Sequence, residues 1–393
     1  MKILWFPRLQ FDIDKLHITT WREMCKEIGK MRQQVCIAIA GKYVKEVFEK
    51  EKYISIFIVR RKYLRIISFY LGGFFKFVLS CYRFKPDVII LDLYSIWFSL
   101  PFLLIPRKTK PTIIVDNRTP FYNTTFQKAS IRDIVMRFYT KVSYLYCKSS
   151  LDGMTVITDY YKEQVCKTYK FNPSTIGVWG SGVNVEAFSI KKNKDTLSIL
   201  KDKFVLMQHG EISYNRGIFE VVRALNLIKK NDVCLLLVGD QVGGSKAKEE
   251  LLVEVKKLNL DKNVFVLPPV PHSEVPKYIS CCNVAILAYP NIEYWNNNNP
   301  IKLLEYLAMG KSIICTDMWT FRNVMGNNKC VHYIKDNNPI TIAEAINYYY
   351  KNRIFLADWG KTGIDIVKSQ YTWSHQALNL LSFIELLQGG KTI

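Results

Sequence analysis

A lysine and a glutamate one turn apart lie at the start of a predicted helix that follows a run of asparagines. Lys302 is in the first turn and Glu305 is in the next. The first N–H groups of a helix have no partner within it, so they and the helix dipole can bind a diphosphate, which Lys302 would reinforce. The Glu305 carboxylate can accept hydrogen bonds from paired hydroxyls such as those of a ribose. The segment therefore predicts a nucleotide-diphosphate site.

The ends of this helix are marked by three residues. Asn299 can cap its first turn, Pro300 fits its first position, and Gly310 can adopt the left-handed conformation that ends a helix. Apolar residues recur at helical spacing between them. The alternative is an ordinary amphipathic helix with Lys302 and Glu305 exposed on its surface, so the rest of the chain must decide.

Length and charge limit the classes of protein that the chain can represent. Its 393 residues predict two domains, and its net charge of +21, from 55 basic and 34 acidic residues, favours an anionic partner. The basic residues are spread over both halves, which argues against a nucleic-acid partner. The ten cysteines include no CxxC pair and no zinc-ligand spacing, which favours a reducing, cytoplasmic setting without a zinc site.

Strand-like and helix-like segments alternate along the chain, which predicts an α/β fold with doubly wound parallel sheets. A glycine-rich stretch at 177–184 separates two such sets and predicts the crossing between two Rossmann-like domains. The predicted strands are 3–6, 35–40, 54–59, 88–91, 112–115 and 153–157, then 204–207, 233–238, 264–266, 284–288 and 312–316. The predicted helices include 21–30, 131–148, 218–229, 245–258 and 273–281.

Glycines and polar residues follow the strands of the second half, and ligands of open parallel sheets bind at these strand ends. Gly210 allows close backbone approach, and Arg216 precedes a helix where it can pair with phosphate oxygens. Gly239 and Asp240 end the next strand. The irregular apolar segment 267–272 follows the third strand, and its backbone groups could bind the edge of a base.

Together these motifs resemble those of the GT-B glycosyltransferases of family 4, a retaining family that transfers sugars from nucleotide diphosphates. The resemblance rests on Gly210 with residues 216–217, on residues 238–240, on residues 300–302 with 305–311, and on residues 181–184 with Phe188. It covers most of residues 177–320. The first half resembles the family mainly in its rhythm of strands and helices.

The resemblance implies the GT-B architecture, in which two Rossmann-like, doubly wound domains face each other across a cleft. Residues 1–180 would form the acceptor-binding domain and residues 181–372 the domain that binds the nucleotide-sugar donor. The run 371–374 and the helix after it, at about 373–393, resemble the family's last helix, which crosses back onto the first domain. The implied activity is that of a hexosyltransferase-like enzyme of polysaccharide or glycan biosynthesis.

The resemblance also assigns roles to single residues. Glu305 corresponds to the family's ribose-binding glutamate, Arg216 to the basic residue that binds the diphosphate, and Lys302 lies in the matching phosphate-side loop. The expected donor-binding residues are Gly210, Glu211, Arg216, Gly239, Asp240, Val270, Asn297, Asn298, Asn299, Pro300, Ile301, Lys302 and Glu305. Two of these depart from the family pattern. Asn297 stands where a sugar-binding glutamate is expected, and Glu211 where a second basic residue often occurs.

The catalytic residues that we expect are Arg216, Lys302, Asp116 and Arg118. Asp116 and Arg118 follow strand 112–115, where Asp116 could orient a sugar hydroxyl and Arg118 could bind a phosphate. The alternative is that these two residues only close a turn. His209 could also contact the donor, although a single histidine at a strand end is more often structural.

The resemblance implies transfer with retention and without a metal or other cofactor. Positive charge at Arg216, Lys302 and the helix start would assist departure of the diphosphate. The leaving phosphate would itself accept the proton of the incoming hydroxyl, so the chemistry requires no separate general base.

Positive charge and an amphipathic stretch favour a lipid-linked acceptor at an anionic membrane surface. Residues 63–82 are apolar but contain Arg65 and Lys76, which argues against a membrane span and suits a helix in the interface. A buried core helix is the competing interpretation. The N-terminus lacks the long apolar core of a signal peptide, so we expect a cytoplasmic protein, peripheral on the inner membrane face.

Two other functions remain open at this stage. A sugar-nucleotide epimerase on the same scaffold would act without any acceptor. A catalytically silent GT-B subunit would be consistent with the changes at Glu211 and Asn297.

Overall fold

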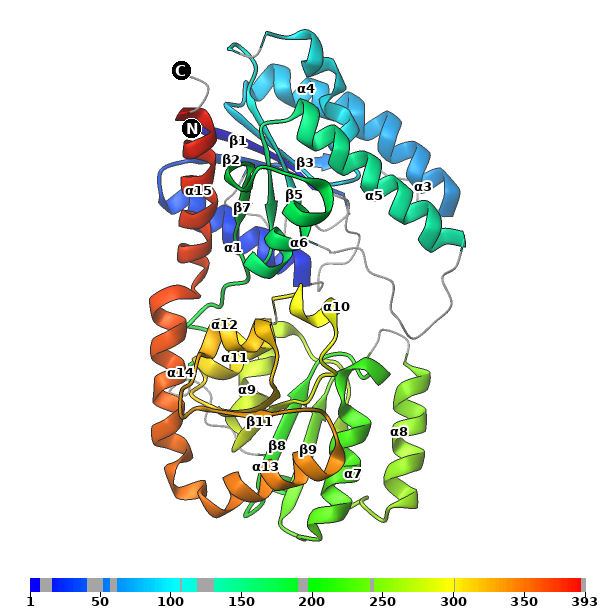
Figure 1. Cartoon of the computed structure of the whole chain (residues 1–393), viewed down its shortest axis with the longest axis vertical. Helices are drawn as coiled ribbons and strands as arrows, with labels where there is room; N and C mark the ends of the chain where they lie inside the picture. The colour runs from blue at the N-terminus through cyan, green and yellow to red at the C-terminus, as the bar shows by residue number, and fades with distance from the viewer. Residues whose placement is uncertain are drawn as a thin grey trace. The chain divides into compact units, whose positions relative to one another are not determined.

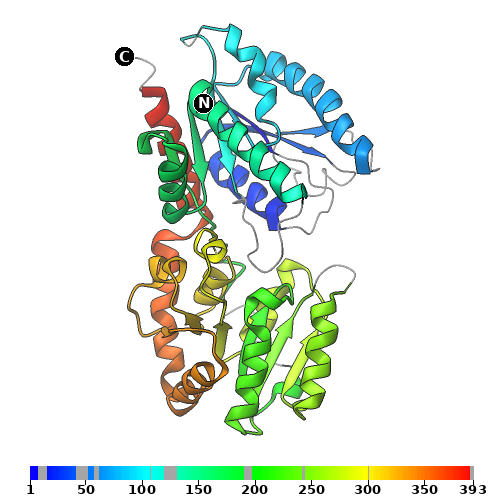
Figure 2. The same ribbon diagram turned by 45° about the vertical axis from the view of Figure 1, so that its right-hand side comes forward.

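The computed structural model describes residues 1–7, 16–40, 52–56, 62–106, 108–118, 131–189, 197–240, 244–299 and 301–389. The chain divides into two compact units, one formed by Met1–Ser181 with Trp373–Ile393 and the other by Gly182–Thr372. Figures 1 and 2 show the helices and strands of each unit.

Unit 1 is built on a parallel sheet of seven strands among the described residues, in the order β3-β2-β1-β4-β5-β6-β7. Every pairing in it is parallel, with Trp5 opposite both Ile37 and Ile90. The strands are β1 (Lys2–Phe6), β2 (Gln34–Ala40), β3 (Lys52–Ile56), β4 (Val88–Leu91), β5 (Thr112–Asn117), β6 (Gly153–Val156) and β7 (Ile176–Val178). Strands β1, β4, β5 and β6 read as near-continuous buried runs, as expected where helices cover both faces.

Helices cover this sheet, and the last helix of the chain is one of them. Helix α15 (Trp373–Gly389) packs on α1 (Leu16–Lys30) and β7, and a Cβ at Gly177 would lie 2.4 Å from the Phe383 ring of α15. The other helical segments of unit 1 are α3 (Lys62–Ser68), the π-helical turn η1 (Phe69–Gly73), α4 (Phe74–Phe84), the 3₁₀ helix η2 (Ile96–Leu104), α5 (Ile131–Ser150), α6 (Asp159–Tyr169) and η3 (Pro173–Thr175).

Unit 2 repeats the design with six parallel strands among its described residues, in the order β10-β9-β8-β11-β12-β13. Successive strand residues alternate between its two faces, so Val205 and Met207 join one core cluster while Phe204 and Leu206 join the other. The strands are β8 (Phe204–His209), β9 (Val233–Val238), β10 (Val264–Leu267), β11 (Val284–Leu287), β12 (Ser312–Thr316) and β13 (Val331–Ile334).

The two faces of this second sheet bury different helices. One core cluster takes residues from α7 (Ile218–Ile228), α8 (Lys246–Lys257) and α13 (Pro339–Lys351). The other takes residues from α9 (Val275–Ser280), α11 (Ile301–Ala308), α12 (Trp319–Met325) and α14 (Leu356–Gln370). The short segments are η5 (Ser198–Leu200), η6 (Tyr214–Arg216), η7 (His272–Glu274), α10 (Glu293–Asn296) and η8 (Arg353–Phe355).

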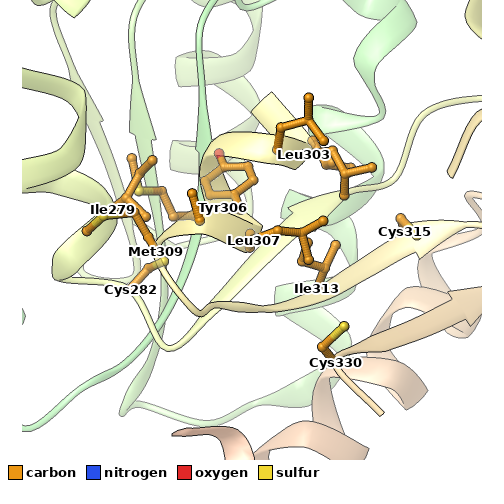
Figure 3. Packing of buried hydrophobic residues seen from close by; sticks show 14 of the residues in the cluster. Ile279, Cys282, Leu303, Tyr306, Leu307, Met309, Ile313, Cys315 and Cys330 are labelled. Carbon is orange, nitrogen blue, oxygen red and sulfur yellow. The ribbon is translucent and has the colours of Figure 1, made fainter. Parts of the chain in front are cut away.

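Helix α11 is buried along most of its length, which fixes the position of its first turn. Leu303, Tyr306 and Leu307 are fully buried and pack with Ile313 of β12 in the cluster of Figure 3. Gly310 then has a φ of +61°, the left-handed conformation predicted for the residue that ends this helix.

The predicted doubly wound parallel α/β architecture is confirmed, but helices α13 and α14, of 13 and 15 residues, were not predicted. The stretch 177–184 is not only a crossing, because β7 includes Gly177 and Val178. Strand β13 was not predicted. The apolar stretch 63–82 forms α3, η1 and α4, and no helix of the described residues is long and apolar enough to span a membrane.

The packing of α14 on the end of α11 yields a stability prediction. A Cβ at Gly360 of α14 would lie 1.8 Å from the Gly310 carbonyl oxygen, so Gly360→Ala should destabilise unit 2 by about 1–3 kcal/mol. Gly29→Ala in α1 is the control, since nothing lies within 4 Å of a Cβ there and alanine favours a helix. Denaturant unfolding should show opposite shifts for the two variants. A neutral Gly360→Ala would contradict this packing.

Candidate functional site

The candidate site lies at the carboxyl ends of β8 and β11, where the strand order of unit 2 reverses. The chain leaves β8 toward β9 on one side and leaves β11 toward β12 on the other, which is the position where open parallel sheets bind ligands. Gly217 allows α7 to begin close to the end of β11. Its φ is +68°, and a Cβ there would lie 1.7 Å from the Ala288 carbonyl oxygen.

Lys302, in the first turn of α11, reaches across to Gly210 at the end of β8. Gly210 has a φ of +98°, and a Cβ there would lie 2.3 Å from the Lys302 ammonium nitrogen. That nitrogen, Nζ, is buried and has no hydrogen-bond partner among the described residues. Burial first, and then the charge of Arg216, hold the pKa of Lys302 well below its ordinary value. The ammonium group of Lys302 thus has N–H donors without partners at a position that water barely reaches.

Arg216 is the second cation of the site. Its guanidinium lies 5.5 Å from the Trp295 ring centroid and 6.0 Å from that of Tyr289, and its side chain is 17% exposed. Glu211 is its ion-pair partner, with 3.5 Å between carboxylate oxygen and guanidinium nitrogen. The Nε atom of Arg216 is buried and has no hydrogen-bond partner among the described residues. The unusual acidic residue at 211 therefore balances part of the charge of Arg216.

Lys302 and Arg216 each have a buried donor atom without a partner among the described residues at this strand-order reversal, and such a pair of cations can bind an anion. Arg216 disfavours the charge of Lys302 and is the largest cause of its lowered pKa after burial. A phosphate group between them would remove that repulsion and satisfy buried donors that are costly to leave unpaired. The site therefore has the electrostatics of a phosphate or diphosphate site.

Glu305 is buried, contrary to the alternative that it lies on an exposed helix face. It is 1% exposed, and its two carboxylate oxygens contact two histidines. His209 Nε2 lies 2.8 Å from Oε2, and His272 Nε2 lies 2.5 Å from Oε1. Burial alone would raise the pKa of Glu305, but the two histidine contacts outweigh it and lower the pKa to about 2. Glu305 is therefore a carboxylate at neutral pH.

His209 is fixed from its other side by Tyr306. The Tyr306 hydroxyl accepts a hydrogen bond of 2.9 Å from the His209 backbone N–H, and it lies 2.8 Å from His209 Nδ1. The hydroxyl can thus donate its own proton to Nδ1, which leaves the ring proton on Nε2 to be donated to Glu305. Burial lowers the pKa of His209, which favours this neutral form.

The loop of residues 297–299, which precedes α11, is held by hydrogen bonds to residues four positions earlier. Asn297 is fully buried and its side-chain N–H₂ donates 2.9 Å to the Glu293 carbonyl, while that of Asn298 donates 2.6 Å to the Tyr294 carbonyl. Asn299 does not form the predicted cap, because its Oδ1 is buried and has no partner among the described residues. Pro300 lies outside the described residues.

The remaining predicted donor residues lie at strand ends, in a loop and at the start of α11 in unit 2. Gly239 has a φ of +123°, and a Cβ there would lie 2.8 Å from the Gly210 carbonyl oxygen, so the two strand ends approach closely. The Asp240 carboxylate accepts a hydrogen bond of 2.8 Å from Ser245, at the start of α8. Ile301 begins α11, and Val270 packs at the edge of the core in the loop after β10.

Asp116 and Arg118 have internal partners in unit 1. Asp116 is the fifth residue of β5, it is buried, and it accepts a hydrogen bond of 2.9 Å from Thr155. Burial raises its pKa to about 6. Arg118 donates to the Trp179 and Gly180 carbonyls at 2.8 and 3.2 Å and lies 3.7 Å from the centroid of the Trp179 ring. These contacts match the alternative in which both residues close the strand end, and their catalytic roles stay predictions.

The two histidine contacts with Glu305 were not predicted. The sequence predicts that His209 could contact the donor, with a structural role at the strand end as the alternative, but it gives no sign that His209 meets a residue 96 positions later. His272 lies in the loop that was expected to contact a base, 33 positions before Glu305. Only the folded unit brings these side chains together.

Comparison with known proteins identifies the fold and a family to which most of unit 2 is similar. Residues 189–365, almost all of unit 2, match the model of the family described as Glycosyl transferases group 1. Solved structures with the same fold include a glycosyltransferase from Rickettsia africae ESF-5 (TM-score 0.74, 15% identity, 98% of each chain covered). Another is HepE from Anabaena with UDP and glucose (TM-score 0.74, 12% identity, 98% of this chain and 99% of that chain). The chain therefore has the GT-B fold.

Curated relatives match about half of the chain. A Bacillus subtilis (strain 168) protein named as a teichuronic acid biosynthesis glycosyltransferase, TuaH, is 28% identical over 49% of this chain and 47% of its own length. The N-acetylgalactosamine-N,N'-diacetylbacillosaminyl-diphospho-undecaprenol 4-alpha-N-acetylgalactosaminyltransferase of Campylobacter jejuni is 25% identical over 52% and 51%. The chain thus spans about half the length of these relatives.

The unpaired charge of Lys302 predicts a stabilising substitution. Folding lowers the pKa of this lysine, so the unfolded chain binds its proton more tightly and wild-type stability should rise with pH toward 10.5. Lys302→Met removes the buried charge and should raise the free energy of unfolding of the ligand-free protein at neutral pH by about 1–3 kcal/mol. The variant should also lose this pH dependence in denaturant titrations.

The matched control is Lys311, just after the same helix, whose ammonium donates to the Ser280 and Cys282 carbonyls at 3.1 and 2.7 Å. Lys311→Met should destabilise, because it leaves those carbonyls without their donor. Destabilisation by both substitutions would contradict an unpaired Lys302.

Proposed function

We propose that the chain is a retaining glycosyltransferase of family 4 that takes its sugar from a nucleotide diphosphate. The observation that carries the proposal is the pair of buried, unsatisfied cationic donors, Lys302 Nζ and Arg216 Nε, at the strand-order reversal of unit 2. A structural lysine would be expected to have partners, as Lys311 does. Donors kept unpaired in the folded state fit a site that is completed by an anionic substrate.

In this proposal the two cations act on the leaving group. The bond between the anomeric carbon and the diphosphate oxygen breaks, and its electron pair leaves with the diphosphate. Arg216, Lys302 and the first N–H groups of α11 stabilise the charge that develops there. The acceptor hydroxyl attacks from the same face, its oxygen bonds to the anomeric carbon, and its proton passes to the leaving phosphate. The configuration is retained, and no step requires a metal or other cofactor.

The remaining parts of the donor would bind around these cations. Glu305 would accept hydrogen bonds from the ribose hydroxyls, and the loop containing Val270 would lie against the base. The sugar would lie near the loop of Asn297 and Asn298. HepE, one of the solved neighbours, was crystallised with UDP, which supports a nucleotide-diphosphate sugar as donor.

We further propose that the acceptor is a lipid-linked or polysaccharide precursor at the cytoplasmic face of a membrane. The name of the Campylobacter relative describes transfer to a diphospho-undecaprenol-linked sugar. A 23% identical relative from Salmonella typhimurium is named an O-antigen chain mannosyltransferase, RfbU. Such acceptors require an enzyme that can work at a lipid surface.

Unit 1 has an exposed apolar face that suits such a surface. Along α3, η1 and α4, the exposed side chains Leu64, Ile67, Leu71, Phe75 and Val78 recur at helical spacing and form one stripe. Helix α5 adds a second stripe at its start. Its exposed apolar residues are Ile131, Ile134, Val135 and Phe138.

The two stripes belong to neighbouring helices, and basic residues accompany them. The Tyr70 and Tyr139 hydroxyls lie 3.4 Å apart and connect η1 to α5, which run near each other in Figures 1 and 2. Lys76, Arg83 and Arg137 are exposed, and residues 62–85 include no acidic side chain. Apolar side chains flanked by positive charge fit the surface of an anionic bilayer.

Turnover tests the donor site. The donor is first identified by the thermal shift that UDP-, GDP- or ADP-sugars produce. Arg216→Gln should then lower kcat for transfer or donor hydrolysis about 100-fold, because it removes a cation that acts on the developing charge. Arg223→Gln is the control, since Arg223 pairs with Glu254 at 2.6 Å on the surface of the same unit. Wild-type turnover in Arg216→Gln would contradict the site, and donor binding without any transfer would indicate a silent GT-B subunit.

Vesicle flotation tests the membrane face. Wild-type protein should bind phosphatidylglycerol vesicles at low salt, and Leu71→Ser with Phe75→Ser should weaken binding at least tenfold, since each buried apolar side chain contributes about 1.5–3 kcal/mol. Val253→Ser is the control, because Val253 is 68% exposed on α8 of unit 2. Equal loss in the control, or no vesicle binding by the wild type, would contradict this surface.

A further inference from the structure

Glu305 is almost inaccessible, although the proposed function requires it to bind a ribose. Its side chain is 2% exposed, and each of its carboxylate oxygens contacts a histidine nitrogen. A ribose hydroxyl can therefore reach the carboxylate only if a neighbouring group moves. The two histidines that contact its oxygens differ in exposure and in the element that carries them.

His209 is held rigidly and is only 8% exposed. It ends β8, its backbone N–H and its Nδ1 both contact the Tyr306 hydroxyl, and Tyr306 is itself fully buried in the core. Displacement of His209 would break these contacts together. His209 therefore stays in contact with Oε2 when the partner of Oε1 changes.

His272 is the exchangeable neighbour. It is 37% exposed, and it begins the short segment η7 just after the loop of residues 268–271, outside any strand. Its ring lies 5.3 Å from the ring of Phe188, at a tilt of 47°. A rotation of this side chain would uncover Oε1 without disturbing the sheet.

We propose that His272 is a latch on the ribose position: it occupies Glu305 Oε1 in the unliganded protein and yields that oxygen to a ribose hydroxyl when the nucleotide binds. His209 is a positioning residue that holds the carboxylate for both partners. The inference rests on the proposed function, because it explains how a ribose reaches Glu305 in the same donor site. The latch keeps a buried carboxylate hydrogen-bonded when no ribose is present, which avoids the cost of an unpaired buried charge.

The latch has a measurable consequence for the discrimination between ribose and deoxyribose. In the wild type, the ribose hydroxyl that binds Glu305 Oε1 replaces the hydrogen bond of His272 to that oxygen. The hydroxyl therefore adds little to the affinity for the nucleotide. Without His272, Glu305 Oε1 has only water as a partner, so the hydroxyl displaces no hydrogen bond within the protein. The ratio of Kd for the deoxynucleotide to Kd for the ribonucleotide should therefore rise.

The experiment measures Kd by titration calorimetry for UDP, GDP and ADP, and then for the 2′-deoxy and 3′-deoxy forms of the tightest binder. His272→Ala should raise the larger of the two deoxy-to-ribo ratios about three- to tenfold, since one net hydrogen bond is worth about 0.5–1.5 kcal/mol. His209→Ala should instead lower the ratio toward one, because the carboxylate loses the partner that orients it. His209→Gln, which keeps an N–H donor at similar reach, should restore a ratio near that of the wild type.

The outcomes separate failure of the latch from failure of the proposed function. If the wild type binds none of the three nucleotides, the proposed function itself is wrong. If it binds but His272→Ala leaves the ratio unchanged or lowers it, the latch is wrong and the donor site stands. A ratio that falls equally in His209→Ala and His209→Gln would overturn the positioning role of His209. Circular dichroism of each variant confirms that the fold is retained.

Discussion

The proximity of the cationic side chains of Lys302 and Arg216, only partly offset by Glu211, is the constraint on which the site in unit 2 depends. Burial first, and then the repulsion from Arg216, lower the pKa of Lys302. Other features of the site accommodate this arrangement. Gly210 leaves room for the ammonium group, and Glu211 offsets part of the charge of Arg216. The folded protein thus carries an electrostatic cost that an anionic ligand would relieve.

The hydrophobic core supplies the stability that makes this cost tolerable. Helix α11 buries seven of its eight residues, and its apolar side chains pack between β12 and the neighbouring helices. Because the helix cannot shift, its first turn and Lys302 stay next to the end of β8. Glycines complete the fit, since Gly217 and Gly239 let backbone segments approach where any side chain would collide. The position of the charges is therefore a consequence of packing.

The sequence predicts the parts of this design that depend on local patterns. Apolar runs identified most strands, and the glycines at 210 and 310 marked conformations that the backbone adopts. Strand β13 was not predicted, and β7 was assigned to a crossing because the stretch that begins at Gly177 is rich in glycine. The contacts of Glu305 could not be predicted, since His209 lies 96 residues away from it along the chain. The cap predicted at Asn299 is absent, since its buried Oδ1 has no hydrogen-bond partner among the described residues.

The buried amide at position 297 follows from the same local packing. The Asn297 side-chain N–H₂ donates to the Glu293 carbonyl, one turn earlier in the segment that begins at α10. A glutamate, the residue expected from the family pattern, has no N–H to donate and would place a negative charge at a fully buried position. Asparagine is therefore the residue that fits this loop, and position 297 offers no carboxylate to a bound sugar. We accordingly expect weaker selection for sugar hydroxyls here than a carboxylate would give, because charge-assisted hydrogen bonds are the stronger ones.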